Sequence, residues 1–135
     1  MSSGNILVVE DDELIRRNLI EYLAGRVRVE VDGARDGVDA LHHVLTRRYD
    51  VVILDMMMPK MSGGDFLDSL EAMLSDPSLN FPGDPPSIIV VTAATDDDLP
   101  REPFQKRYGK LVRGMFRKPV DFDALASEIE KNLDA

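Results

Sequence analysis

The chain has 135 residues, 44% of them hydrophobic, which is enough for one domain with a single core. The absence of cysteine excludes disulfides, thiolate metal sites and a cysteine nucleophile, and the net charge of -9 argues against a nucleic-acid partner. No apolar run approaches the roughly 18 residues of a membrane span. We therefore expect a cytoplasmic protein without a membrane partner, folded as a single domain over residues 1–135 with a disordered tail at 1–4.

Short apolar runs alternate with segments of helical period in the first half of the chain. The runs "NILVVE" (5–10) and "DVVILD" (50–55) are too short for helices and are interpreted as buried strands. Between them, "VRVEV" (27–31) alternates valine with charge, as an edge strand does. The amphipathic helices that follow the first two strands have the predicted apolar stripes Ile15, Leu19, Tyr22 and Leu23, and Val38, Leu41 and Leu45.

The second half continues the alternation. A proline-rich loop (75–87) precedes the strand "SIIVVTA", and "GMFRKP" predicts a last strand. Pro100 and Pro103 interrupt the segment between these strands, so we expect only a shortened or distorted helix there. The remaining helices have the predicted stripes Phe66, Leu67, Leu70, Met73 and Leu74, and Phe122, Leu125, Ile129 and Leu133.

This alternation predicts an α/β fold, a doubly wound parallel sheet of five strands with helices on both faces. Ligands of such folds bind at the carboxyl ends of the strands. The residues expected at those ends are Glu10, Asp11, Asp12, Asp55, Thr92 and Lys118. Because closely packed carboxylates repel one another unless a cation neutralises them, a hard divalent ion such as Mg²⁺ is implied.

Four short motifs stand at these strand ends in a fixed order. They are "EDD" after the first strand, "D" closing the third with "MMMPKMSG" behind it, "TA" closing the fourth and "KP" closing the fifth. Together they closely resemble the receiver domain of two-component response regulators, over essentially the whole chain. The resemblance implies a flavodoxin-like strand order of 2-1-3-4-5.

The resemblance also implies a role for each residue at the strand ends. Asp55 would accept a phosphoryl group, and Thr92 and Lys118 would contact its oxygens. The implied Mg²⁺ ligands are Asp11, Asp12, Asp55 and the backbone carbonyl of Met57, with the side chain of Asp12 best placed for direct ligation. These roles fit phosphoryl transfer, which depends on positioning and electrostatics.

We accordingly expect a stand-alone receiver that takes phosphate from a histidine kinase or histidine phosphotransfer protein onto Asp55. It would catalyse transfer to its own side chain and slow loss of the phosphate, and would not be a turnover enzyme. The signal would pass to a downstream protein through the region 95–120, which contains a cluster of basic residues.

Two departures from the family pattern carry predictions. Met115 stands where the family often has an aromatic switch residue, which puts that switching route in doubt. Met57 and Ala94 are apolar where some receivers place polar side chains that orient the hydrolytic water, so we predict slow self-dephosphorylation.

Three alternatives remain open. One is a receiver-like binding module that works without phosphorylation. Another is a Mg²⁺-dependent phosphatase with an Asp nucleophile, of the haloacid dehalogenase kind, which needs a second Asp where Met57 stands. The third is a flavodoxin-like FMN carrier, whose phosphate loop the acidic "EDDE" would oppose.

Overall fold

The computed structural model describes residues 4–58, 60–93 and 108–134, which contain five parallel strands in one sheet. The strands are β1 (Gly4–Val9), β2 (Val29–Ala34), β3 (Val51–Asp55), β4 (Ser87–Thr92) and β5 (Val112–Arg117). Their spatial order is β2-β1-β3-β4-β5, which confirms the predicted fold class and strand order. All five carboxyl ends therefore lie along one edge of the sheet.

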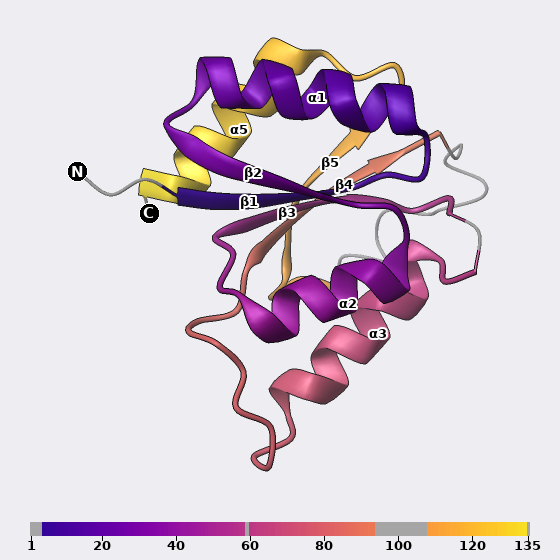
Figure 1. Ribbon diagram of the computed structural model, residues 1–135, viewed down its shortest axis with the longest axis vertical. Helices are drawn as coiled ribbons and strands as arrows, with labels where there is room; N and C mark the ends of the chain where they lie inside the picture. Colours follow the sequence, from indigo (N-terminus) through magenta and orange to yellow (C-terminus); the bar gives the residue numbers. More distant parts are fainter. Residues whose placement is uncertain (1–3, 59, 94–107, 135) are drawn as a thin grey trace.

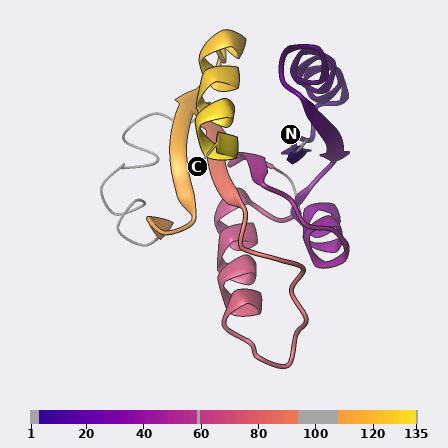
Figure 2. The ribbon, with the colours of Figure 1, turned by 90° about the vertical axis from the view of Figure 1, so that its left-hand side faces the viewer.

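Helices cover both faces of the sheet (Figure 1). Helices α1 (Glu13–Arg26) and α5 (Phe122–Asp134) pack on one face, and α2 (Gly37–Thr46) and α3 (Gly63–Leu74) on the other. Figure 2 shows the same two layers from the side, with α5 beside β5. The helix expected between Pro100 and β5 falls largely on residues 94–107, which lie outside the described ranges.

The two helical layers enclose two apolar clusters that are separated by the sheet. Every residue of β3 is buried, as the continuous apolar run predicted for a strand covered on both faces. On the α1 and α5 side, Ile53 packs with Leu19 and Leu125, and on the other side Leu54 packs with Phe66. Packing on both faces holds the end of β3 in place.

Helix α2 does not bury the apolar stripe that was predicted for it. Val38 and Leu45 are 45% and 37% exposed, whereas Ala40 and Val44 are fully or almost fully buried. Gly37 is also buried, and a Cβ atom there would lie 2.7 Å from Met61 Cγ. The small residues at one helical face allow α2 to approach the sheet and α3 closely, so the larger side chains are turned outward.

Four other expectations are also corrected. Ile15, predicted to lie on the buried face of α1, is 41% exposed. Strand β2 begins at Val29, because the N–H group of Val27 donates to the Leu23 carbonyl and terminates α1. Gly4, assigned to a disordered tail, is the first residue of β1, and its N–H group donates to the Arg28 carbonyl. Strand β1 ends at Val9, so Glu10 is the first residue beyond it.

Candidate functional site

Asp55 is the last residue of β3, and its carboxylate is held from two sides. Only 3% of the residue is exposed. The N–H group of Met57 donates to Asp55 Oδ1 at 3.0 Å, and Lys118 Nζ lies 3.2 Å from Asp55 Oδ2. A buried carboxylate needs such partners, because burial without them would strongly disfavour its charge.

The chain after Asp55 is fixed by close packing against the start of α3. Ser62 caps this helix by accepting from the Asp65 N–H group, and the Gly63 N–H group donates to the Met56 carbonyl at 3.2 Å. A Cβ atom at Gly63 would lie 2.8 Å from Met56 Cα, which leaves no room for any other residue. The glycine therefore lets the helix approach the strand end and positions the loop that carries Met57.

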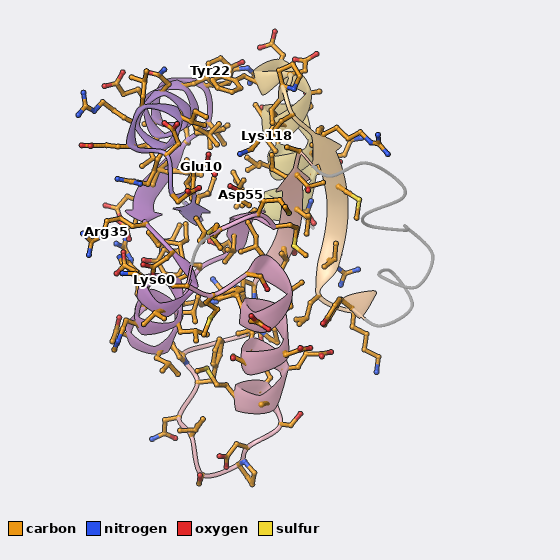
Figure 3. All side chains as sticks on the ribbon, turned by 90° about the vertical axis from the view of Figure 1, so that its right-hand side faces the viewer. Glu10, Tyr22, Arg35, Asp55, Lys60 and Lys118 are labelled. Carbon is orange, nitrogen blue, oxygen red and sulfur yellow. The ribbon has the colours of Figure 1, made fainter. Side chains whose placement is uncertain are left out.

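Lys118 joins two acids that come from different strands. Its Nζ atom lies 3.1 Å from Glu10 Oε1, in addition to the contact with Asp55. Figure 3 shows that the three residues lie in the same part of the molecule. Glu10 follows β1 and is 4% exposed. Burial and the neighbouring Asp55 carboxylate raise the pKa of Glu10 to about 8, and the opposing effect of Lys118 is smaller. Two buried acids thus share one cation.

The pKa of Lys118 is also raised. Burial acts to lower it, but the hydrogen bond to Glu10 and the charges of both acids outweigh that effect, so the side chain stays an ammonium. Its backbone is equally constrained. The Lys118 N–H group donates to the Thr92 carbonyl at 2.9 Å, and the Lys118–Pro119 peptide bond is cis.

Thr92 ends β4 next to Asp55 and is 2% exposed. The Met56 N–H group donates to the carbonyl of Val91, the residue before Thr92, which ties the ends of β3 and β4 together. The structure therefore brings Asp55, Thr92 and Lys118 to the same edge of the sheet, where the sequence predicted them.

Asp11 and Asp12 have different surroundings in the structure. Asp12 is the N-cap of α1, and its Oδ1 atom accepts from the Ile15 N–H group at 3.0 Å. Asp11 instead belongs to a cluster with Glu10 and Asp55, in which one carboxylate oxygen from each residue lies within 4.8 Å of the others. The geometry therefore favours Asp11, and not Asp12, as the direct cation ligand of the first loop.

Glu10 is the site residue that the sequence reasoning did not assign to the cation. The signal was present, because Glu10 directly follows the apolar run of β1, where a side chain can still point along the sheet edge. Among the described residues, the acidic cluster contains Glu10 and not Asp12, so Glu10 becomes a candidate ligand beside those predicted.

The cluster fits a small divalent cation. Its donors are carboxylate oxygens, the ligands that Mg²⁺ prefers, and one oxygen from each of Glu10, Asp11 and Asp55 lies within 4.8 Å of the others. The Met57 carbonyl stays a predicted ligand.

Several predicted features fall partly or wholly outside the described ranges. Ala94 and three members of the basic cluster, Arg101, Lys106 and Arg107, belong to the undescribed residues 94–107. Lys110 and Arg113 are exposed near the start of β5. Met115 is half-buried and packs against the cluster on the α2 and α3 side.

Comparison with known proteins identifies the family. The profile described as response regulator receiver domain matches residues 6–130. The regulatory protein VanRB of Enterococcus faecalis is 36% identical over 96 residues, which are 71% of this chain and 39% of that protein. A protein-glutamate methylesterase/protein-glutamine glutaminase of Geobacillus kaustophilus is 31% identical over 81% of this chain and 29% of its own length. The chain thus spans well under half of these curated relatives.

Solved structures agree with the profile. A CheY-like receiver domain from Methylobacillus flagellatus has a TM-score of 0.76 at 25% identity and covers 97% of this chain and 99% of its own. The response regulator protein TrrA from Thermotoga maritima, solved in complex with Mg(2+)-BeF, has a TM-score of 0.73 at 28% identity, with coverage of 96% and 98%. None of the four helices in the described ranges is long and apolar enough to span a bilayer. With its strand order, its acidic edge and these matches, the chain belongs to the response regulator receiver domain family.

Proposed function

We propose that this chain is a phosphorylation-dependent signalling switch that accepts a phosphoryl group on Asp55. The observation that carries the proposal is the position of the Asp55 carboxylate, which is fixed at the sheet edge by the Met57 N–H group and the Lys118 ammonium. A nucleophile in phosphoryl transfer must be positioned and its surroundings must neutralise the transferred charge, and this site offers both.

The donor is proposed to be a phosphohistidine of a histidine kinase or a histidine phosphotransfer protein. An Asp55 oxygen forms a bond to phosphorus, and the phosphorus–nitrogen bond breaks. Its electron pair goes to the imidazole nitrogen, which takes up a proton from solvent. Lys118 is within reach of the oxygens of the new acyl phosphate, and the Thr92 hydroxyl would donate a hydrogen bond to one of them.

Glu10, Asp11 and Asp55 would hold Mg²⁺, with the Met57 carbonyl as a further oxygen ligand. When bound, the ion supplies positive charge that offsets the negative charge on the transferring oxygens. Asp12 is proposed to act only as the helix cap, since its carboxylate is already used by the Ile15 N–H group.

The signal is proposed to leave the domain by protein–protein contact. A phosphoryl group adds a charge of about -1.5 to -2 beside Lys118, and this can bias a pre-existing two-state equilibrium. The region 95–120 remains our candidate output surface. That the receiver stands alone is also a prediction, because the curated relatives extend well beyond the matched part.

Mass spectrometry after incubation with acetyl phosphate and Mg²⁺ tests the proposal. We expect one phosphate adduct on the wild type, none on Asp55→Asn, and an unchanged adduct on Asp84→Asn, a control at an exposed loop acid. An adduct of undiminished yield on Asp55→Asn would contradict the acceptor assignment. Absence of any adduct on a folded wild type would favour the binding module that works without phosphorylation.

A further inference from the structure

Arg16, near the start of α1, contacts the loop that carries the acidic cluster. Its Nη1 atom donates to the backbone carbonyl of Glu10 at 2.8 Å. The N–H group of Glu10 donates to the Ala34 carbonyl, at the end of β2, at 3.1 Å. Both backbone polar groups of Glu10 are therefore held, one by the neighbouring strand and the other by the Arg16 side chain.

The aliphatic stem of Arg16 packs over Gly33 of β2. A Cβ atom at Gly33 would lie 3.1 Å from Arg16 Cδ and 2.9 Å from Ile20 Cδ1, so the glycine leaves room for the stem where α1 lies against β2. Arg16 is accordingly half-buried, although it carries a charge. Because the stem is already confined by this packing, less side-chain entropy is lost when the guanidinium is held at one carbonyl.

The guanidinium of Arg16 is used differently from that of its neighbour. Arg17 Nη2 lies 3.5 Å from Glu13 Oε1 on the surface of α1, and the Arg17 side chain is 62% exposed. Within the described ranges, Arg16 forms no ion pair with a carboxylate, and its guanidinium donates to the Glu10 carbonyl. Hydrogen bonds from charged donors are stronger than those between neutral groups, so this contact can fix the loop.

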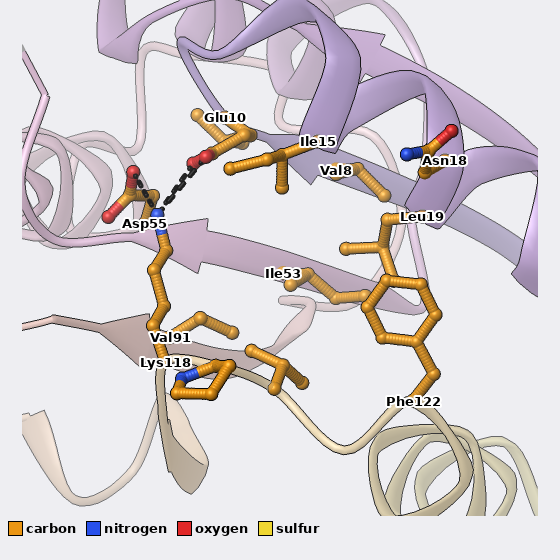
Figure 4. Close-up of a pocket in the computed structure, with 13 residues that line it drawn as sticks. Val8, Glu10, Ile15, Asn18, Leu19, Ile53, Asp55, Val91, Lys118 and Phe122 are labelled. Atoms are coloured by element: carbon orange, nitrogen blue, oxygen red, sulfur yellow. Dashed lines mark hydrogen bonds and ion pairs between the residues drawn. The ribbon is translucent and has the colours of Figure 1, made fainter.

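The position of Glu10 depends on such contacts, because packing does not enclose it on every side. A groove of about 510 Å³ borders Glu10, between α1 and the junction of β5 and α5. Figure 4 shows the Glu10 carboxylate at one end of this groove, where it meets Lys118 beside Asp55. A shift of the Glu10 backbone would move its carboxylate away from both residues.

We propose that Arg16 is a positioning residue of the acidic site. By its hydrogen bond to the Glu10 carbonyl, it holds the Glu10 carboxylate where it meets Lys118 and where it would ligate Mg²⁺. Groups that orient metal ligands change metal affinity by about 10–100-fold, and Arg16 acts on the backbone of the ligand, so we expect about three- to tenfold. The effect on Mg²⁺ rests on the proposed function, whereas the contact between Arg16 and Glu10 is present in the metal-free protein.

Calorimetric titration with Mg²⁺ separates positioning from charge. Arg16→Met removes a positive charge beside the acidic cluster, so electrostatics alone would strengthen Mg²⁺ binding. Loss of positioning has the opposite sign, and we expect binding to weaken about three- to tenfold. The matched control Arg17→Met removes the same charge from the next residue and should strengthen binding by less than about twofold, because exposed charges are screened. Mg²⁺ affinity in Arg16→Met equal to or above that in Arg17→Met would overturn the proposal.

Amide hydrogen exchange of the full chain, measured by NMR in the presence of a chelator, tests the contact without the metal. In Arg16→Met the Glu10 N–H group should exchange at least about threefold faster than in the wild type, and in Arg17→Met it should not. The Val27 N–H group, which donates to the Leu23 carbonyl at the far end of α1, should keep its wild-type rate and exclude a general loss of stability.

Unchanged exchange of Glu10 in folded Arg16→Met, or an equal acceleration at Val27, would overturn the role of Arg16. Methionine and arginine have similar helix propensities, so we expect α1 to be retained. If Arg16→Met does not fold, Arg16→Gln carries the test, because its shorter side chain does not reach the Glu10 carbonyl in the same way. A wild type that binds no Mg²⁺ would contradict the metal site of the proposed function, and the exchange of Glu10 would still decide the role of Arg16.

Discussion

Lys118 Nζ lies 3.2 Å from Asp55 Oδ2, so the proposed acceptor is already paired with a cation before any phosphate arrives. The same ammonium contacts Glu10, which comes from a different strand end. One side chain thus contacts both buried acids, and its loss would affect the stability of the fold as well as the chemistry.

Lys118→Met should destabilise the protein in Mg²⁺-free buffer. It leaves Asp55 and Glu10, which are 3% and 4% exposed, without their shared cation. Removal of one partner from a fully buried pair costs about 3–5 kcal/mol. Because the Lys118 side chain is 26% exposed, we expect a smaller loss of about 2 kcal/mol in the free energy of unfolding, measured by urea denaturation.

The matched control is Lys110→Met, which removes the same charge from an exposed position and should change the free energy of unfolding by less than about 0.5 kcal/mol. In the double variant Lys118→Met/Asp55→Asn, the change in the free energy of unfolding should differ from the sum of the two single changes, because one buried charge is removed together with its partner. Strict additivity would contradict the coupling between these residues.

The stability of the metal-free protein should fall as the pH rises from 5 to 8. Burial and Asp55 raise the pKa of Glu10 from 4.5 to about 8, so the folded state retains a proton that the unfolded state releases. This contribution is complete below pH 4.5 and is lost as the pH rises through about 8. Urea denaturation in the presence of a chelator measures the decrease.

Glu10→Gln cannot ionise and should flatten this pH dependence, whereas Glu13→Gln, at an exposed acid of α1, should leave it unchanged. Mg²⁺ should stabilise the wild type more at pH 8 than at pH 6, because its ligands must be ionised. If the slope survives in Glu10→Gln, another group is responsible for it.

The fold could be predicted because each buried strand is a short, continuous apolar run, and the pattern of β3 depends only on burial from both faces. The buried face of each helix was harder to predict. The stripe of α2 was assigned to Val38 and Leu45, but Gly37 and Ala40 face the core because small residues allow close packing. Hydrophobicity alone ranks a valine above an alanine and therefore selects the wrong face.

The residues of the site could likewise be predicted only in part. Asp55, Thr92 and Lys118 were predicted because each stands at a strand end, and the parallel sheet brings those ends together. Both aspartates follow β1 closely, and the sequence analysis predicted Asp12 as the direct ligand. In the structure the Asp12 carboxylate accepts from the Ile15 N–H group, and for this reason we propose Asp11 for that role.

Substitution of these two aspartates should therefore have opposite consequences. Asp11→Asn should weaken Mg²⁺ binding at least about tenfold in calorimetric titration, since it removes a charged ligand. Asp12→Asn should retain Mg²⁺ affinity, because asparagine also caps helices well. Asp12→Ala should cost about 1 kcal/mol of stability through the lost cap, again with little change in Mg²⁺ affinity. A larger loss of affinity in Asp12→Asn than in Asp11→Asn would restore Asp12 as the direct ligand.

Met57 should set the lifetime of the phosphorylated state. Met57 is 62% exposed, and its backbone N–H group donates to the Asp55 carboxylate. Because that hydrogen bond uses the backbone, the Met57 side chain can be changed without loss of it. An apolar side chain cannot orient a water for attack on phosphorus, and we expect the wild-type phosphate to persist far beyond seconds in Mg²⁺. Met57→Gln supplies an amide that can position such a water, and should shorten the lifetime several-fold. Met58→Gln, at the half-buried neighbouring position, provides the control. Mass spectrometry after removal of the donor measures how fast the phosphate is lost. The assignment would be contradicted if the wild-type phosphate decayed within seconds, or if it decayed no faster in Met57→Gln than in Met58→Gln.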